Sequence, residues 1–298
     1  MPDEEVQVVD IAGRRLRLTN LQKVLYPATG TTKAEVLDYL VRVSGPLLRQ
    51  LADRPVTRIR WPHGTADEQF FEKNLPAGAP RWVRRAKVPT SPRDEDPGRG
   101  TITYPLLDDV PGLVWAGNLA ALELHTPQWR IGPDGRPAEP DRLVVDLDPG
   151  EGVGLPECSK LAVLVAERLA DDGMDAVPVT SGGKGMQLYA TLPPSGLPGG
   201  SDAEGVREYA HRLADGLARD HGKLVTANMT KSLRRGKVLL DWSQNHAAKT
   251  TITPYSLRGR AQPTAAAPRR WDELGDALGQ LSYLDVLERL ETAGDLMP

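Results

Sequence analysis

Residues 142–154, RLVVDLDPGEGVG, carry more information about the architecture than any other part of the sequence. Their apolar run predicts a buried strand that ends with Asp146 and Asp148 before a Pro-Gly turn. Because side chains alternate along a strand, the two carboxylates are expected to point to the same side. Such a pair can chelate Mg²⁺ or Mn²⁺ and leave coordination positions for phosphate oxygens and water. Two exposed aspartates in a turn are the alternative interpretation.

Several other segments are predicted to be strands. They are residues 57–61, 102–107, 176–180, 186–192 and 237–242. Apolar residues at three- and four-residue spacings predict a helix over residues 32–51, which begins with the capping box Thr32-Lys-Ala-Glu. Two more helices are expected, one after Pro156 and one after the capping box Ser201-Asp-Ala-Glu.

Strands and helices mix along the chain without strict alternation. An α+β fold with antiparallel or mixed sheets flanked by helices is therefore expected, rather than a Rossmann repeat. The sequence has no repeat at a fixed period and no sharp internal boundary. Residues 1–298 are accordingly predicted to form a single domain.

Composition restricts the class of protein. The 298 residues are 40% hydrophobic and 26% charged, which excludes a disordered or collagen-like chain. Apolar runs are far shorter than the ~20 residues of a membrane span, and the N-terminus MPDEEVQVVD is acidic where a signal peptide is basic. Cys158 is the only cysteine, which excludes an intrachain disulfide and a cysteine-based zinc site. A soluble protein of the reducing cytoplasm is expected.

The net charge of -3 hides a local asymmetry. Residues 231–260 carry seven basic side chains against one acid, Asp241, whereas the tail from Trp271 has seven acids and only Arg289. A basic block in a weakly acidic protein indicates a defined polyanion site rather than a basic coat. A solvated charged surface that faces an acidic helix is the alternative.

The glycine-rich segment VTSGGKGMQLY, residues 179–189, lies between two predicted strands. Its glycines can turn backbone N–H groups inward as an anion nest, and Lys184 adds a charge that suits a phosphate. It is not a Walker A loop, because Gly185 and not Ser or Thr follows the lysine. A hairpin turn with a solvated lysine is the alternative.

A third carboxylate, Asp241, ends the apolar strand KVLLDW directly after the basic block. Beside Asp146 and Asp148 it would complete a two-metal site, in which ions ~3.5 to 4 Å apart activate an attacking oxygen and clamp phosphates. A salt bridge from Asp241 to Arg234 or Arg235 is the structural alternative.

Phe70 and Phe71 are adjacent and are the only phenylalanines in the chain. Neighbouring strand residues face opposite ways, so at least one of the two rings is expected to meet solvent or a ligand. Base stacking on an aromatic face is worth ~1 to 3 kcal/mol per base. Core packing of both rings in a bent segment is the alternative.

His125 is one of five histidines in the chain. Taken alone, it is interpreted as a hydrogen-bonded structural residue.

Taken together, the sequence resembles the polymerase domain of bacterial DNA ligase D, in the archaeo-eukaryotic primase-polymerase superfamily. The motifs that carry the resemblance are LTNLQKVLYPATGTTK, FFEK, ELHTPQW, VVDLDPGEGV, TSGGKG, MTKSLRRGKVLLDWSQN and KTTITPYSLRGR. The likeness runs from about Leu18 to Arg289. No Lys-x-Asp-Gly ligase signature occurs, so the chain resembles a stand-alone mycobacterial or actinobacterial primase-polymerase without a ligase or nuclease module.

The resemblance implies a role for each matching residue. Asp146, Asp148 and Asp241 match carboxylates that bind two Mn²⁺ or Mg²⁺ ions and catalyse the reaction. The residues that match nucleotide-binding positions are Phe70, Phe71, His125, Ser181, Lys184, Gln187, Arg234, Gln244, Lys249 and Arg258. The phenylalanines match a pair that stacks on a nucleotide or template base. Lys23 and Lys33 match lysines that hold the downstream 5′-phosphate of a gap or broken end.

Two features depart from the family pattern. Gln187 stands where an SGxxGxH pattern has histidine, and an amide can donate a hydrogen bond to phosphate but carries no charge. The Pro- and Arg-rich loop over residues 89–100 looks longer than its usual counterpart, which in relatives helps to bridge two DNA ends. Gap filling is therefore expected, with end synapsis as the alternative.

The resemblance implies a template-dependent polymerase that extends a primer 3′-hydroxyl with an NTP or dNTP, prefers ribonucleotides and releases pyrophosphate. The expected partners are gapped or broken duplex DNA with a 5′-phosphate, and the end-joining factors Ku and DNA ligase. The protein is expected to be a monomer associated with the nucleoid, without a membrane partner. A two-metal nuclease or phosphatase and a non-catalytic DNA gap or end binder are the alternatives.

Overall fold

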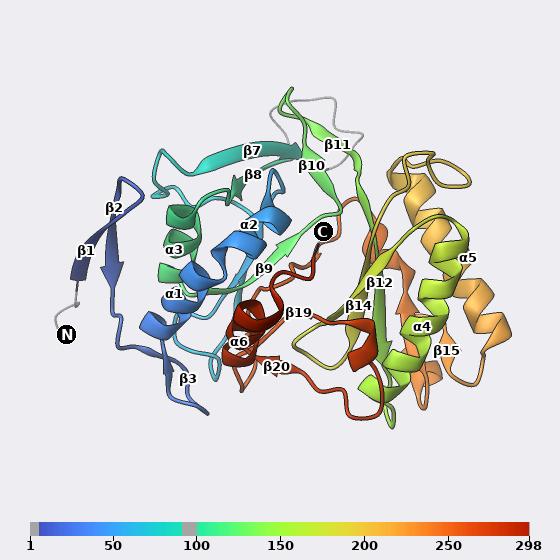
Figure 1. Ribbon diagram of the computed structural model, residues 1–298. Coiled ribbons are helices and arrows are strands. Elements are labelled where there is room, and N and C mark those ends of the chain that lie inside the picture. Colours follow the sequence, from blue (N-terminus) through green and yellow to red (C-terminus); the bar gives the residue numbers. More distant parts are fainter. Residues whose placement is uncertain (1–5, 91–99, 298) are drawn as a thin grey trace.

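The computed structural model describes residues 6–90 and 100–297, in which two sheets are covered by helices (Figure 1). The larger sheet has the strand order β15 (Val225–Thr226), β16 (Val238–Asp241), β12 (Arg142–Pro149), β14 (Met186–Thr191), β13 (Ala176–Thr180) and β19 (Ala267–Pro268). Its strands pair antiparallel except β15 with β16, which are parallel. The mixed sheet confirms the expected α+β class.

The smaller sheet is antiparallel throughout. Its order is β17 (Thr251–Ile252), β9 (Ala121–Thr126), β5 (Thr57–Arg60) and β6 (Phe70–Glu72). Five two-stranded ribbons complete the described sheets. They are β1 (Val6–Ile11) with β2 (Arg14–Thr19), β3 (Val24–Tyr26) with β4 (Thr31–Thr32), β7 (Arg84–Pro89) with β8 (Thr101–Leu106), β10 (Trp129–Ile131) with β11 (Pro137–Pro140), and β18 (Thr264–Ala265) with β20 (Leu281–Ser282).

The helices divide between the two sheets (Figure 1). Those that pack on the larger sheet are α4 (Leu155–Asp171) and α5 (Ala203–Asp220). Those that pack together beside the smaller sheet are α1 (Lys33–Arg42), α2 (Ser44–Leu51), α3 (Val110–Asn118) and α6 (Tyr283–Ala293). The described 3₁₀ turns are η1 (Lys231–Arg234), η2 (Trp242–Asn245) and η3 (Trp271–Glu273). No helix among the described residues is both long and apolar enough to cross a bilayer.

The central strand β12 is buried on both faces and separates two hydrophobic cores. Leu143, Val145 and Leu147 pack in the core that contains α4 and α5. Val144 points the other way, into the core shared by the smaller sheet and its helices. Because side chains alternate along β12, Asp146 shares the face of Val144 and therefore lies between the two halves of the molecule.

Two predicted helices differ in detail from the observed ones. The helix expected over residues 32–51 starts with the predicted Thr32 capping box but is broken at Val43 into α1 and α2. Pro46 explains the break, because proline has no N–H to donate to the carbonyl four residues earlier. The N-cap of α5 is Asp202, whose side chain accepts from Gly205 N, and not Ser201.

The other predicted segments correspond to observed elements, whereas α3, α6 and most of the short strands were not predicted. The helix after Pro156 is α4, and the predicted strands correspond to β5, β8, β13, β14 and β16. Residues 91–99 of the predicted long loop lie outside the described part of the chain. Pro89, at the start of that predicted loop, is the last residue of β7.

Candidate active site

The acidic end of β12 meets both neighbouring strands. Asp146 lies directly opposite Asp241 of β16 on one side and Gln187 of β14 on the other. Opposite residues of an antiparallel pair have Cβ atoms ~4.5 to 5.5 Å apart. The fold therefore brings together at the backbone level three residues that are far apart in sequence.

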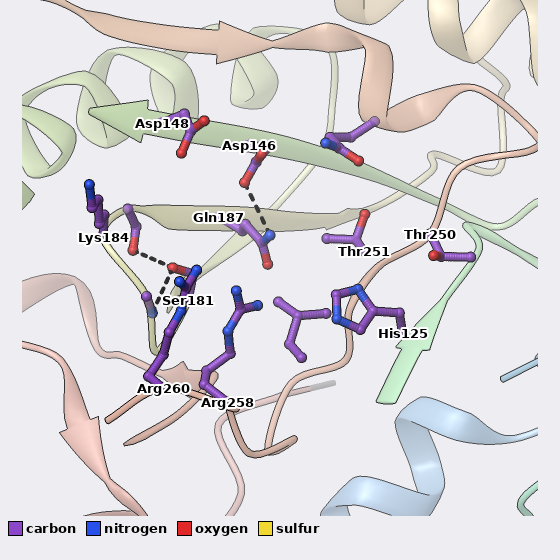
Figure 2. Close-up of a pocket in the computed structure, with 14 residues that line it drawn as sticks. His125, Asp146, Asp148, Ser181, Lys184, Gln187, Thr250, Thr251, Arg258 and Arg260 are labelled. Atoms are coloured by element: carbon purple, nitrogen blue, oxygen red, sulfur yellow. Dashed lines mark hydrogen bonds between the residues drawn. The ribbon is translucent and has the colours of Figure 1, made fainter. Parts of the chain in front are cut away.

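A cavity of about 230 Å³ opens beside this strand end (Figure 2). Its lining residues are His125, Asp146, Asp148, Ser181, Gly183, Lys184, Gly185, Gln187, Gln244, Thr250, Thr251, Ile252, Arg258 and Arg260. Eight of the residues proposed from sequence are among them. Figure 2 shows the carboxylates of Asp146 and Asp148 on the β12 side, with Arg258 and Arg260 facing them across the cavity.

Electrostatics single out Asp146. Burial, together with the nearby carboxylates of Asp148 and Asp241, raises the pKa of Asp146 to about 7. A hydrogen bond from Gln187 Nε2 to Asp146 Oδ1, at 3.1 Å, acts in the opposite direction. Like charges crowded in a buried place are compensated best by a cation, so the donor set fits a hard divalent metal ion.

The side chain of Asp241 does not yet take part in this cluster. Its Oδ1 accepts from Ser243 N at 3.0 Å and from Ser243 Oγ, and its Oδ2 accepts from Gln244 Nε2 at 3.2 Å, so it caps η2. Accordingly, the described residues hold no group of three acidic, histidine or cysteine side chains already arranged around a metal. Binding a metal together with Asp146 and Asp148 would compete with these contacts to η2.

The salt bridges considered as alternatives for Asp241 are not formed. Arg235 instead lies 3.8 Å from Glu151, measured between Nη2 and Oε1. The guanidinium of Arg234 donates to the carbonyl of Met229, and its buried Nε has no partner among the described residues. Arg234 lies outside the cavity lining, so its predicted contact with a nucleotide stays a prediction.

The side-chain amide of Gln187 contacts the acidic cluster and is not available to donate to a phosphate. Its Oε1 accepts from Tyr189 Oη at 3.2 Å while its amide nitrogen donates to Asp146. The side chain is 5% exposed, so these two contacts hold the amide in place. An uncharged donor at this position supports ionised Asp146, which differs from the phosphate contact expected from sequence.

The SGGKG loop joins β13 to β14 as a tight turn. Gly182 has φ +69° and would place a Cβ 2.6 Å from Arg258 Cγ, so only glycine fits. Gly182 N donates to Gln280 Oε1 at 2.7 Å, and Gly183 N donates to Ser181 Oγ at 3.2 Å. These amides already have partners, so the predicted anion nest is wrong for these two groups, while Lys184 keeps its side chain on the cavity wall.

The aromatic pair lies away from this cavity, on the edge strand β6. Phe70 is 46% exposed and Phe71 58% exposed, which excludes the core-packing alternative. Glu72 holds β6 to β5 through ion pairs of 2.5 Å to Arg60 and 3.5 Å to Arg58. Two aromatic faces are therefore presented to solvent on an anchored strand.

The predicted phosphate-binding lysines lie together but apart from the cavity. The backbone N of Lys33 donates to the carbonyl of Lys23 at 2.8 Å. Lys23 is half-buried, whereas Lys33 is 5% exposed and its ammonium donates to the carbonyls of Thr19 at 2.7 Å and Asn118 at 2.8 Å. A phosphate would have to displace these carbonyl oxygens from Lys33, so its role stays a prediction.

Several residues at the site were not selected from the sequence. Arg260 belongs to the basic block already noted, and its spacing of two from Arg258 is the signal that could have identified it. Glu123 lies two residues before His125 on β9 and hence on the same side of that strand. Lys249, which was selected, is exposed at the rim and donates to Ser243 Oγ.

A strand end with two carboxylates that faces arginines across a cavity is suited to an enzyme that binds a divalent ion together with a polyphosphate. Residues 32–297 match the family model described as "LigD, primase-polymerase domain". The chain therefore belongs to the LigD primase-polymerase domain family, which consists of nucleotidyltransferases. This confirms the resemblance inferred from the motifs.

Known relatives and a solved structure support the same family assignment. The multifunctional non-homologous end joining protein LigD of Mycolicibacterium smegmatis is 49% identical over 284 residues, 95% of this chain and 36% of that protein. The bifunctional LigD of Bacillus subtilis is 33% identical over 282 residues, 94% of this chain and 43% of that protein. The chain thus spans less than half the length of these relatives. The polymerase domain of Mycobacterium tuberculosis ligase D in complex with DNA superposes with a TM-score of 0.88 at 49% identity, covering 95% of this chain and 96% of that one.

Proposed function

We propose that residues 1–298 form one catalytic domain that extends a primer 3′-hydroxyl on a DNA template, filling short gaps or broken ends and releasing pyrophosphate. The observation that carries this proposal is the cavity in which Asp146 and Asp148 face Arg258 and Arg260. The end-joining names of the relatives and the DNA in the similar structure support the choice of a DNA substrate.

Two Mn²⁺ or Mg²⁺ ions are proposed to be held by Asp146, Asp148 and a rotated Asp241. Bound there, such ions activate the attacking hydroxyl and neutralise charge on the phosphates. The raised pKa of Asp146 supports this role, because burial and the neighbouring carboxylates outweigh the compensation that Gln187 and Arg258 provide.

The opposite wall is proposed to bind the triphosphate of an NTP or dNTP. Phosphoryl transfer requires little covalent chemistry from the protein, so catalysis depends on orientation and on charge neutralisation. Arg258 and Arg260 supply two cations on this wall, and Lys184 adds a third from the loop beside the end of β12. Ser181 and Gln244 add polar contacts. Lys249 and Arg234, which lie outside the cavity lining, are proposed to contact the phosphates or the primer. Selection of ribonucleotides would require a contact to the 2′-hydroxyl.

The DNA is proposed to reach the cavity from the β6 side. Phe70 and Phe71 are exposed there and could stack on a template or nucleotide base whatever its identity. Lys23, with Lys33 beneath it, is proposed to bind the downstream 5′-phosphate. Action at the nucleoid as a monomer, together with Ku and a DNA ligase, completes the proposal.

Primer extension on a duplex with a short gap tests this function. The wild-type protein should add the nucleotide complementary to the template base, and Asp146→Ala and Asp148→Ala should abolish addition while the fold is retained. Comparing a 5′-phosphate with a 5′-hydroxyl on the downstream strand tests the phosphate contact, and comparing NTP with dNTP tests the sugar preference. Shortening of the primer would identify a nuclease, and DNA binding without addition would identify a non-catalytic binder.

A further inference from the structure

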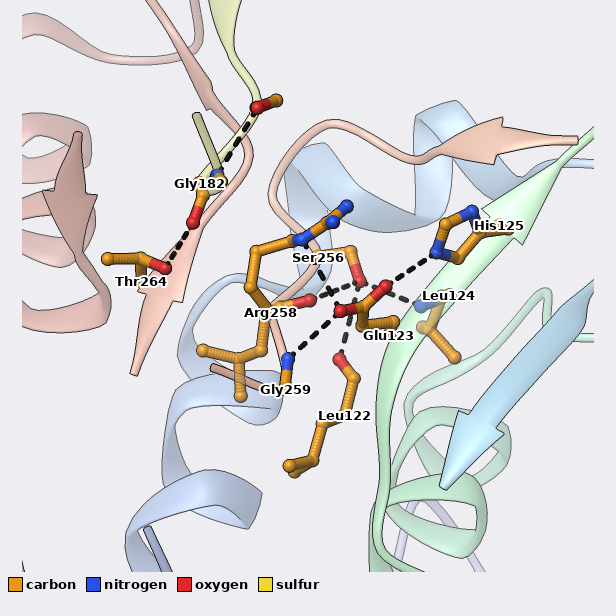
Figure 3. A network of polar contacts seen from close by, with 12 residues as sticks. Leu122, Glu123, Leu124, His125, Gly182, Ser256, Arg258, Gly259 and Thr264 are labelled. Carbon is orange, nitrogen blue, oxygen red and sulfur yellow. Dashed lines mark hydrogen bonds and ion pairs between the residues drawn. The ribbon is translucent and has the colours of Figure 1, made fainter. Parts of the chain in front are cut away.

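A buried carboxylate, Glu123, lies behind the cavity wall and contacts two residues that line it (Figure 3). Glu123 is on β9 and is 5% exposed, so a bound nucleotide would not touch it directly. Its partners His125 and Arg258 come from segments more than 130 residues apart in the chain. Glu123 therefore links the β9 side of the cavity, which carries His125, to the segment that carries Arg258.

The contacts of Glu123 use both of its oxygens. Oε2 accepts a hydrogen bond from His125 Nε2 at 2.8 Å. Oε1 accepts from Gly259 N at 3.0 Å and lies 3.3 Å from Arg258 Nε. Burial opposes ionisation, but the His125 hydrogen bond and the Arg258 charge outweigh it and lower the pKa of Glu123, so this carboxyl is an anion at neutral pH.

The segment that carries Arg258 is held against β9 at the backbone as well. Ser256 Oγ accepts from Leu124 N at 2.8 Å. Gly259 packs on Trp61, where a Cβ would come within 2.1 Å of the indole ring. Glu123 thus acts on a segment whose main chain is already placed, which leaves the side chains of His125 and Arg258 as the parts that it can orient.

We propose that Glu123 is a positioning residue for nucleotide binding, which holds the His125 ring by Nε2 and orients Arg258 toward the triphosphate. This inference rests on the proposed polymerase function. With Nε2 bound to Glu123, the ring presents Nδ1 to a ligand in the cavity.

The isosteric variant Glu123→Gln removes this arrangement with little change in volume. The amide has one oxygen, and the Gly259 N–H competes for it, so the NH₂ group is turned toward His125. The ring is then driven to carry its proton on Nδ1 and has no anion beside it. Glu123→Asp keeps the charge but is one methylene too short to contact both partners. Glu273→Gln, the control, removes a half-buried carboxylate that is paired with Arg289 and does not line the cavity.

Nucleotide binding and histidine spectroscopy together test the proposal. Affinity for a non-hydrolysable NTP analogue is measured by calorimetry with Mn²⁺, and gap-filling KM and kcat are measured separately. Glu123→Gln should raise Kd and KM about tenfold with a much smaller change in kcat. In ¹⁵N-histidine NMR spectra, assigned with His125→Gln, the His125 proton should move from Nε2 to Nδ1. Glu123→Asp should give an intermediate Kd, and Glu273→Gln should lower thermal stability with Kd and the His125 signals unchanged.

Unchanged Kd and unchanged His125 signals in folded Glu123→Gln would overturn the proposal. If that variant does not fold, the same result in Glu123→Asp overturns it. A wild-type protein that binds the analogue but adds no nucleotide to gapped DNA would overturn the polymerase function, while the Kd and NMR comparison would still decide the role of Glu123. A wild-type protein that binds no nucleotide would overturn both.

Discussion

Asp146→Asn should stabilise the metal-free protein while removing its activity. Burial and Asp148 raise the pKa of Asp146 to about 7, compared with ~3.9 for an unfolded aspartate. Keeping the group ionised at pH 8 therefore costs up to about 4 kcal/mol of folding free energy. A side chain with partial access to water bears only part of this cost. The expected increase in the folding stability of Asp146→Asn is therefore about 2 kcal/mol. For a chain of this size that corresponds to a rise in Tm of about 4 °C.

The sign of this effect depends on pH. Below about pH 4 Asp146 is protonated in both states and the substitution should change little. Between pH 4 and pH 7 the folded state binds more protons than the unfolded state, so wild-type stability falls as pH rises and the advantage of the variant grows. Above pH 7 the advantage should be constant.

Thermal and guanidinium unfolding in EDTA at pH 4, 6 and 8 measures this directly. Asp276→Asn, at a carboxylate whose side chain is 89% exposed, is the matched control and should have no effect. Mn²⁺ should reverse the order by stabilising the wild type more than the variant. Equal or lower stability of Asp146→Asn at pH 8 in EDTA would refute the view of this strand end as a crowded acidic cluster.

Four further substitutions separate binding from stability. Phe71→Ala should weaken binding of gapped DNA by about 1 to 3 kcal/mol with an unchanged Tm, because the ring is 58% exposed; unchanged affinity in fluorescence anisotropy would argue against stacking. Gly259→Ala should destabilise the fold by about 1 to 3 kcal/mol in guanidinium titrations, since the new Cβ would overlap the Trp61 ring, and a neutral result would contradict this close packing. Lys33→Ala should lower Tm because it leaves two carbonyls without their donor, whereas Lys23→Ala should leave Tm unchanged and weaken only the preference for a 5′-phosphate; the reverse pattern would exchange these roles.

Features of the site that depend on a few consecutive residues could be predicted from the sequence. Alternation along β12 was enough to place Asp146 and Asp148 on one side, and the glycines of the SGGKG turn marked a real tight turn between strands. The spacing of apolar residues located α1, α2, α4, α5 and the strands β5, β8, β12, β13, β14 and β16, but not α3, α6 or the shorter strands. These features depend on neighbours a few residues away, which the sequence displays directly.

The side-chain contacts that depend on pairing between distant segments could not be predicted from the sequence. The β12 and β16 register places Asp241 opposite Asp146, yet its carboxylate accepts from Ser243, two residues later in the sequence, and caps η2. Lys33 was expected from the resemblance to hold a 5′-phosphate, and nothing in the sequence near it shows the carbonyls of Thr19 and Asn118 that it contacts. Glu123 was overlooked for the same reason, since its role becomes visible only once Gly259 packs against β9.

Metal bound at the end of β12 decides whether the cavity is a polymerase site. Crystals soaked with Mn²⁺ and a non-hydrolysable NTP should show anomalous peaks about 2 to 2.6 Å from the oxygens of Asp146 and Asp148. Asp241 should have rotated from η2 to join them, with the two ions ~3.5 to 4 Å apart. Crystals that bind the nucleotide with no Mn²⁺ between these carboxylates, and with Asp241 still capping η2, would contradict the proposed mechanism.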